Sequence, residues 1–198
     1  KAIVPFEATE ELIAFLKKFL PKDVEVAGLV DLPVAETKSD TAYALPQLLE
    51  AIKAAEKEGY DAVVLTCHGD PGVQEARELV NIPVLGPMMV GIHMSSMLGH
   101  RFCILTPSQE IRRWQLQNLR AYGFEGKGSI RAIAYGAEKA IEEYNKYEKT
   151  GKSALIDEAV SECVKAIEQD DVTVITFGCG GLIWARDGIK KGLKEKGY

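Results

Sequence analysis

The sequence predicts an α/β fold of two pseudo-symmetric lobes, each a parallel sheet flanked by helices. Short β-branched apolar runs alternate with longer helical patterns along all 198 residues, an order typical of parallel βαβ units. An acidic residue, an apolar strand, a cysteine and glycines follow one another twice, at 61–72 and at 171–181. Such an internal repeat indicates two similar units. Hydrophobic residues make up 46% of the chain, which is enough for a sizeable core.

The expected strands are short apolar runs bounded by glycine, proline or polar residues. They span 3–5, 24–30, 62–65, 82–85, 102–106, 129–134 and 172–177. Every residue of the run 62–65 is apolar, as is typical of a strand that is buried on both faces.

The expected helices carry apolar residues at helical spacing. They span 9–20, 41–58, 70–80, 86–99, 107–122, 137–169 with a break at 150–151, and 180–197. Pro46 is tolerated in the second helix if the regular helix begins there, and Gly59 ends it. Asp70 is expected to cap the third helix, with Pro71 in the first helical position.

The predicted lobes span 1–99 and 100–181, and the C-terminal helix 182–198 is a further candidate element of the first lobe. The second lobe has no counterpart of the segment 81–86, so we expect the natural chain to continue past residue 198. Ligands of open α/β sheets bind at the carboxyl ends of the strands. We therefore expect an active site in a cleft between the two lobes.

The composition argues against several classes of function. The net charge is −5, the pI is about 5.4, and no basic run indicates a nucleic-acid partner. No apolar run approaches the roughly 20 residues that span a bilayer, so no membrane partner is expected. The cysteines and histidines lack metal-ligand spacing, and no dinucleotide fingerprint or P-loop indicates a cofactor. Reduced thiols favour a cytoplasmic location.

Two cysteines, Cys67 and Cys179, follow the two repeated strands. Each is expected just before a helix N-terminus, where unpaired N–H groups favour an anion and lower the pKa of a thiol. Between two such thiols, a thiolate removes a proton from one face of a carbon acid and a thiol returns one on the other. The pair therefore indicates inversion of a stereocentre. Cys103 in a strand and Cys163 on a helix are interpreted as structural.

Several motifs resemble those of hydantoin racemases, in the aspartate/glutamate racemase superfamily. Cys67-His-Gly-Asp-Pro-Gly72 is similar to their C-F-G-D-P-G segment, and Gly178-Cys-Gly-Gly-Leu182 is similar to their G-C-A-G-M segment. The resemblance continues through 81–86 and 93–102, and 36–40 falls where the family has an I-E-S…D pattern. It implies two lobes around a cleft and a cofactor-independent racemase with two cysteine bases.

On this resemblance Cys67 and Cys179 are the catalytic residues. Residues beside the thiols and at strand ends are expected to contact the substrate. They are Pro5, Phe6, Glu36, Thr37, Thr66, His68, Gly69, Asp70, Gly180 and Gly181. We further expect a small-molecule substrate, a homo-oligomer, and neither metal nor cofactor.

Departures from the family pattern bear on the substrate. Val4-Pro5-Phe6 stands where the family has N-P-N, His68 replaces a phenylalanine, and 86–90 is apolar where relatives have G-I-G-E-A. The C-N-T and G-C-T motifs of aspartate and glutamate racemases, which bind the charges of an amino acid, are absent. These differences favour a neutral, ring-shaped substrate such as a 5-substituted hydantoin or allantoin.

Three alternatives stay open at this point. The first is a related enzyme on another substrate: a racemase of amino acids, or a single-thiol decarboxylase resembling arylmalonate decarboxylase. The second is a ligand-binding protein on the same scaffold without catalysis. The third is a redox pair formed by Cys67 and Cys179.

Overall fold

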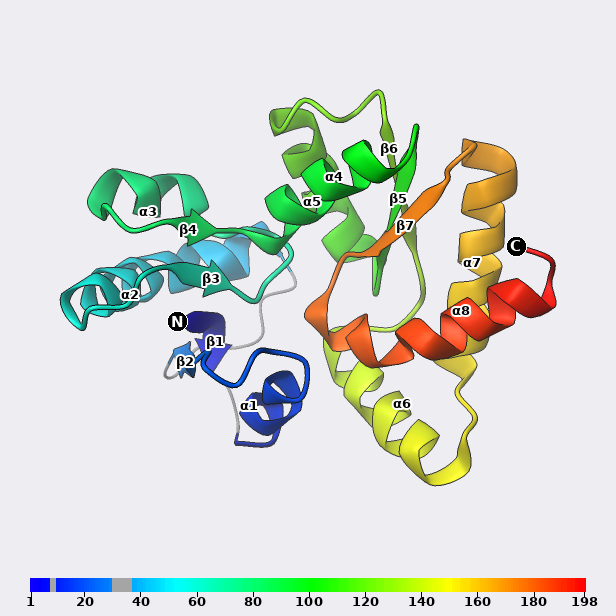
Figure 1. Cartoon of the computed structure of the whole chain (residues 1–198), viewed down its shortest axis with the longest axis horizontal. Coiled ribbons are helices and arrows are strands. Elements are labelled where there is room, and N and C mark those ends of the chain that lie inside the picture. The colour runs from blue at the N-terminus through cyan, green and yellow to red at the C-terminus, as the bar shows by residue number, and fades with distance from the viewer. Residues whose placement is uncertain (8–9, 30–36) are drawn as a thin grey trace. The chain divides into compact units, whose positions relative to one another are not determined.

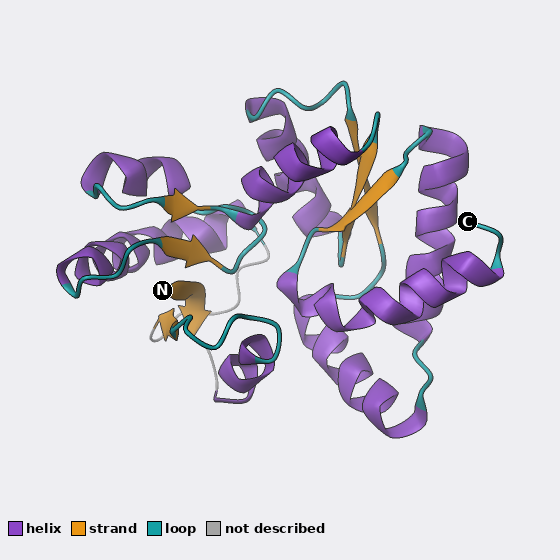
Figure 2. Ribbon diagram, viewed as in Figure 1, coloured by secondary structure: helices purple, strands orange, loops and turns teal. Residues whose placement is uncertain are grey.

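The α/β class is confirmed by the computed structural model, which describes residues 1–7, 10–29 and 37–198 (Figure 2). The chain forms two units, Lys1–Val90 and Gly91–Tyr198, and each contains one parallel sheet flanked by helices. The division between the units falls within helix α4 (Pro87–Leu98). The lobe limits expected from the sequence stay a prediction.

The first unit is built on a four-stranded sheet of order β2-β1-β3-β4 (Figure 1). Its strands are β1 (Ala2–Glu7), β2 (Val26–Leu29), β3 (Val63–Leu65) and β4 (Val84–Leu85). Its helices are α1 (Glu10–Lys17), α2 (Lys38–Lys57) and α3 (Val73–Leu79).

Helices cover both faces of this sheet, and successive side chains of β1 point alternately to the two faces. Ala2 and Val4 point to one face, where they pack with Leu12 and Leu16 of α1. Ile3 points to the other face and joins the core that α2 and α3 complete. The sheet is therefore covered on both sides, as the apolar strands predicted.

The second unit is built on a three-stranded sheet of order β6-β5-β7. Its strands are β5 (Phe102–Thr106), β6 (Gly128–Ala132) and β7 (Val174–Phe177). Its other elements are α5 (Gln109–Ala121), α6 (Ala137–Thr150), α7 (Ala154–Asp170), the 3₁₀ helix η1 (Gly180–Ala185) and α8 (Arg186–Glu195).

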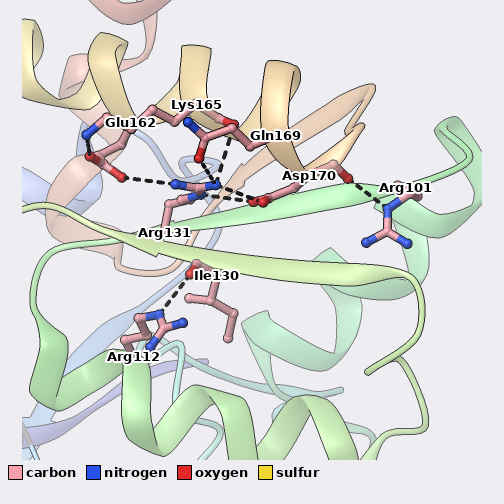
Figure 3. Close-up of polar contacts among 8 residues, drawn as sticks. All are labelled: Arg101, Arg112, Ile130, Arg131, Glu162, Lys165, Gln169 and Asp170. Carbon is pink, nitrogen blue, oxygen red and sulfur yellow. Dashed lines mark hydrogen bonds and ion pairs between the residues drawn. The ribbon is translucent and has the colours of Figure 1, made fainter.

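A polar cluster joins β6 to the end of α7 (Figure 3). The guanidinium of Arg131 donates to both carboxylate oxygens of Asp170, at 2.9 and 2.7 Å, and to the side chain of Gln169 at 3.0 Å. Arg101 donates to the main-chain carbonyl of Asp170 at 2.8 Å. The cluster holds the C-terminus of α7 beside the sheet, where a cation also offsets the negative end of the helix.

The structure corrects three helix predictions. Helix α2 begins at Lys38, before Pro46, because Thr37 and Asp40 form a capping box that starts it earlier. The predicted C-terminal helix 180–197 is divided into η1 and α8. The helix expected at 70–80 is only Val73–Leu79. The break expected at 150–151 is confirmed, since α6 ends at Thr150 and α7 begins at Ala154.

Within the described ranges, every helix is too short or too polar to cross a membrane.

Candidate active site

Cys67 lies at the carboxyl edge of the first sheet, two residues after the end of β3 at Leu65. The N–H of Thr66 donates to the carbonyl of Ile3 at 3.0 Å and so continues the pairing of β3 with β1. The half-buried Cys67 then opens a turn in which its carbonyl accepts a hydrogen bond from Asp70 N–H at 3.1 Å. The register of β1 against β3 brings Pro5 to this same edge.

Pro5 and Phe6 coincide with an irregularity in the sheet. The pairing of β1 with β2 shifts register between Val4 and Glu7, where Pro5 has no N–H to contribute to a ladder. Pro5 is buried in β1, whereas the side chain of Phe6 and the whole of Glu36 lie outside the described residues.

The prediction that Cys67 immediately precedes a helix N-terminus is wrong. Helix α3 begins at Val73, and its N-cap is Gly72 with φ 67°. Asp70 has a positive φ of 49°, so the chain makes two tight left-handed bends before the helix starts. Cys67 and the start of α3 are therefore separated in the chain by residues 68–72.

Asp70 caps a different helix from the one expected. Its carboxylate accepts hydrogen bonds from the N–H groups of Met88 at 2.9 Å and Met89 at 2.7 Å, the first two donors after Pro87 of α4. Gly86 makes room for this contact, because a Cβ there would lie 2.3 Å from Cγ of Asp70. The loop 67–72, which carries Cys67 and is called the thiol loop below, is thereby hydrogen-bonded to the start of α4.

His68 is a buried, neutral group next to the thiol. Its side chain is 7% exposed, and burial lowers its pKa from 6.5 to about 4. At neutral pH the imidazole therefore carries no charge. The imidazole is therefore a polar but uncharged neighbour of Cys67. Gly69, which is also buried, has no side chain and contributes only its backbone.

Cys179 occupies the corresponding edge of the second sheet, and here the expected position before a helix is confirmed. It is the N-cap residue of η1, with extended backbone at φ −157° and ψ 136°. Its carbonyl accepts from Leu182 N–H at 3.1 Å. A Cβ on Gly181 would lie 3.5 Å from the Cys179 sulfur, so the absence of a side chain at this glycine leaves space beside the thiol.

A buried amide that the sequence analysis missed lies behind the second thiol. Gln115 of α5 is 0% exposed, and its Nε2 donates to the carbonyl of Gly178 at 2.6 Å. Its signal in the sequence is weak, because a lone glutamine in an amphipathic helix is usually a surface residue.

The other two thiols differ sharply from this pair. Burial raises the pKa of Cys103 to about 11 and that of Cys163 to about 12. Both side chains are 1% exposed, whereas Cys67 and Cys179 are each partly exposed. The interpretation of Cys103 and Cys163 as structural agrees with this burial.

Of the remaining predicted site residues, Thr37 is exposed at the start of α2, where its hydroxyl accepts from Asp40 N–H at 3.2 Å. Gly180 opens η1 directly beside Cys179. Among the residues that the structure describes, no group of three or more His, Cys, Asp or Glu side chains is placed to hold a metal ion.

Two parallel α/β units, each with a partly exposed cysteine after a sheet strand, define the structural class. The family model described as Asp/Glu/hydantoin racemase matches residues 7–195. The chain therefore belongs to the Asp/Glu/hydantoin racemase family.

Individual relatives agree with this assignment. The chain is 30% identical over 159 residues to a hydantoin racemase of Pseudomonas sp. (strain NS671), covering 80% of this chain and 61% of that protein. It is 30% identical over 152 residues to a hydantoin racemase of Paenarthrobacter aurescens, covering 76% of this chain and 61% of that protein. The chain thus spans about three fifths of the length of these curated relatives.

The fold is also that of solved structures. An allantoin racemase from Klebsiella pneumoniae superposes with a TM-score of 0.80 at 24% identity, over 98% of this chain and 78% of that one. At this identity the likeness shows the fold alone.

Proposed function

We propose that the protein is a cofactor-independent racemase that inverts the α-carbon of a 5-substituted hydantoin-like substrate. Cys67 and Cys179 are the two acid–base groups of this reaction. The observation that carries the proposal is the contrast among the four thiols: two are partly exposed after sheet strands, and two are buried with raised pKa values.

The proposed reaction moves two protons and needs no redox partner. A thiolate takes the proton from the α-carbon, and the electron pair of the broken C–H bond moves onto the adjacent carbonyl as an enolate. The thiol on the opposite face then donates its proton to the same carbon, and a C–H bond of inverted configuration forms. The thiolate and the thiol have exchanged roles, so the opposite enantiomer reacts in the reverse sense. Each positioned group typically contributes about 10²–10⁴-fold in rate.

The substrate class rests on two kinds of support. The curated relatives are hydantoin racemases, and solved structures of the same fold include allantoin racemases. The loop 67–72 also supplies no positive charge at neutral pH, because His68 is neutral and the negative charge of the Asp70 carboxylate is directed to two backbone N–H groups. A neutral ring suits this setting better than a zwitterionic amino acid does.

The test is proton exchange with single thiol variants. Racemisation and uptake of solvent deuterium are measured on both enantiomers of 5-substituted hydantoins, on allantoin and on free amino acids. Cys67→Ala and Cys179→Ala should each lose racemisation by about 10²-fold or more. Each variant should still exchange deuterium into the one enantiomer whose proton faces the remaining thiol.

Cys163→Ala is the matched control, since it removes a buried thiol from α7. It should racemise at the rate of the unmodified protein. The proposal is wrong if either active-site variant still labels and inverts both enantiomers at the original rate. A chain that binds hydantoins without any exchange would instead be a ligand-binding protein. Homo-oligomerisation and a cytoplasmic location stay predictions.

A further inference from the structure

The loop that carries Cys179 is held from two directions at the residue before the thiol. The N–H of Gly178 donates to the carbonyl of Leu105 at 2.7 Å, which extends the pairing of β7 with β5. The carbonyl of Gly178 accepts from Nε2 of Gln115 at 2.6 Å. Both polar groups of this residue are therefore bonded to the body of the second unit.

The contact between Gln115 and Gly178 is closely packed. A Cβ on Gly178 would lie 2.9 Å from Oε1 and 3.0 Å from Nε2 of Gln115, and 2.8 Å from Cγ2 of Ile104. Only glycine allows the amide to approach the backbone this closely. Gln115 itself is completely buried, so its side chain has little freedom to turn away.

This bond sets the direction of the next peptide. The peptide bond between Gly178 and Cys179 is trans, so fixing the Gly178 carbonyl also fixes the plane that carries the Cys179 N–H. That plane leads into the extended N-cap conformation of Cys179, from which the side chain extends. A rotation of the plane would move the sulfur.

We propose that Gln115 is a positioning residue for the Cys179 thiol, acting through the carbonyl of Gly178. It touches no reacting atom. Its role is to keep the thiol at a fixed place against the α-carbon, and in this sense the inference rests on the proposed function. Misplacing a reacting group by about 1 Å can cost on the order of 10²-fold in rate.

The test replaces the amide and follows each thiol separately. Gln115→Met keeps a similar length without the donor, and Gly178→Ala displaces the same amide from the other side. The alkylation rates of Cys67 and Cys179 by iodoacetamide are measured by peptide mapping across pH 6–9, on variants whose folded fraction is known from circular dichroism. The kcat and KM values are measured for both enantiomers.

The matched control is Leu119→Ala. It lies on the same helix and is 1% exposed, but it packs near Gly128, at the other end of the sheet. Both test variants should change the rate of Cys179 alkylation by about tenfold or more, or shift its dependence on pH. The alkylation rate of Cys67 should stay unchanged. The value of kcat should fall about 10- to 100-fold while KM moves less than about threefold. The control should lower stability without this selectivity.

The outcomes separate the two proposals. Equal effects on both thiols, no effect on Cys179, or the same selective loss in Leu119→Ala would overturn the role of Gln115. A selective change at Cys179 in a protein that racemises nothing would support the positioning role and overturn the proposed function. Racemisation that survives Gln115→Met with unchanged kcat would overturn the positioning role alone.

Discussion

The carboxylate of Asp70 lies 2.7 Å from the backbone nitrogen of Met89 and accepts its hydrogen bond. The same carboxylate accepts a hydrogen bond from Met88 N–H at 2.9 Å, so it satisfies the first two backbone donors of α4. Asp70 lies on the loop after β3, and both α3 and β4 lie between this loop and α4 in the chain. Because the same residue closes the turn that begins at Cys67, the thiol loop and the start of α4 depend on each other.

Replacing Asp70 by asparagine should therefore destabilise the protein. The amide retains one acceptor oxygen but loses the charge, and its NH₂ group faces a backbone donor. We expect the free energy of unfolding to fall by about 1–3 kcal/mol, measured by urea denaturation. Asp23→Asn, an exposed aspartate, should change it by less than about 0.5 kcal/mol. Equal losses in the two variants would contradict the capping role.

Gly86→Ala should have a similar effect by a steric route. The added Cβ would lie 2.3 Å from Cγ of Asp70, so the carboxylate must leave its two donors. In the Asp70→Ala background the atoms that the methyl group would strike are absent, and the second substitution should then cost little. A double-mutant cycle should give a coupling of about 1–3 kcal/mol. Strict additivity would show that the two residues do not interact in this way.

The cap also shows where sequence reasoning ends. An aspartate followed by proline before an apolar helical pattern is a sound local prediction of an N-cap, yet Asp70 adopts φ 49° and bonds to residues 18 and 19 positions later. Strand positions and the α/β class depend on local hydrophobic pattern and could be predicted. The partners of Asp70 and Gln115 depend on tertiary approach, which no local pattern encodes.

His68 should make stability depend on pH. Its pKa is about 4 in the folded protein, against 6.5 for an ordinary histidine, so the unfolded chain binds a proton in this interval and the folded protein does not. Stability should therefore rise with pH between about 4 and 6.5, by about 3 kcal/mol in all. His68→Phe should remove this part of the slope in urea titrations at several pH values. An unchanged slope would contradict the burial of a neutral imidazole.

The pair Arg131 and Asp170 should contribute to stability through geometry as well as charge. Two hydrogen bonds at 2.9 and 2.7 Å join the groups, both side chains are 21% exposed, and the bond to Arg131 lowers the pKa of Asp170 below 3.8. Asp170→Asn should cost about 1–2 kcal/mol at neutral pH, and the cost should diminish below about pH 4 as the carboxylate protonates. Asp187→Asn, which breaks an exposed pair with Arg186, should cost less. Equal costs would show that the geometry of the partly buried pair adds nothing.

The four thiols should divide into two classes of reactivity, independent of any substrate. Cys103 and Cys163 are each 1% exposed, and their pKa values are raised to about 11 and about 12. Alkylation needs an accessible thiolate, and in the folded state these two thiols are neither accessible nor ionised at neutral pH. They should react only through unfolding, at rates that rise steeply with urea. Cys67 and Cys179 are partly exposed and should react directly, with rates that urea below the transition barely changes. Peptide-mapped alkylation distinguishes the two classes. Labelling of Cys103 as fast as Cys179 without urea would contradict the packing of β5 against α7, since Cys103 lies in the cluster that joins them.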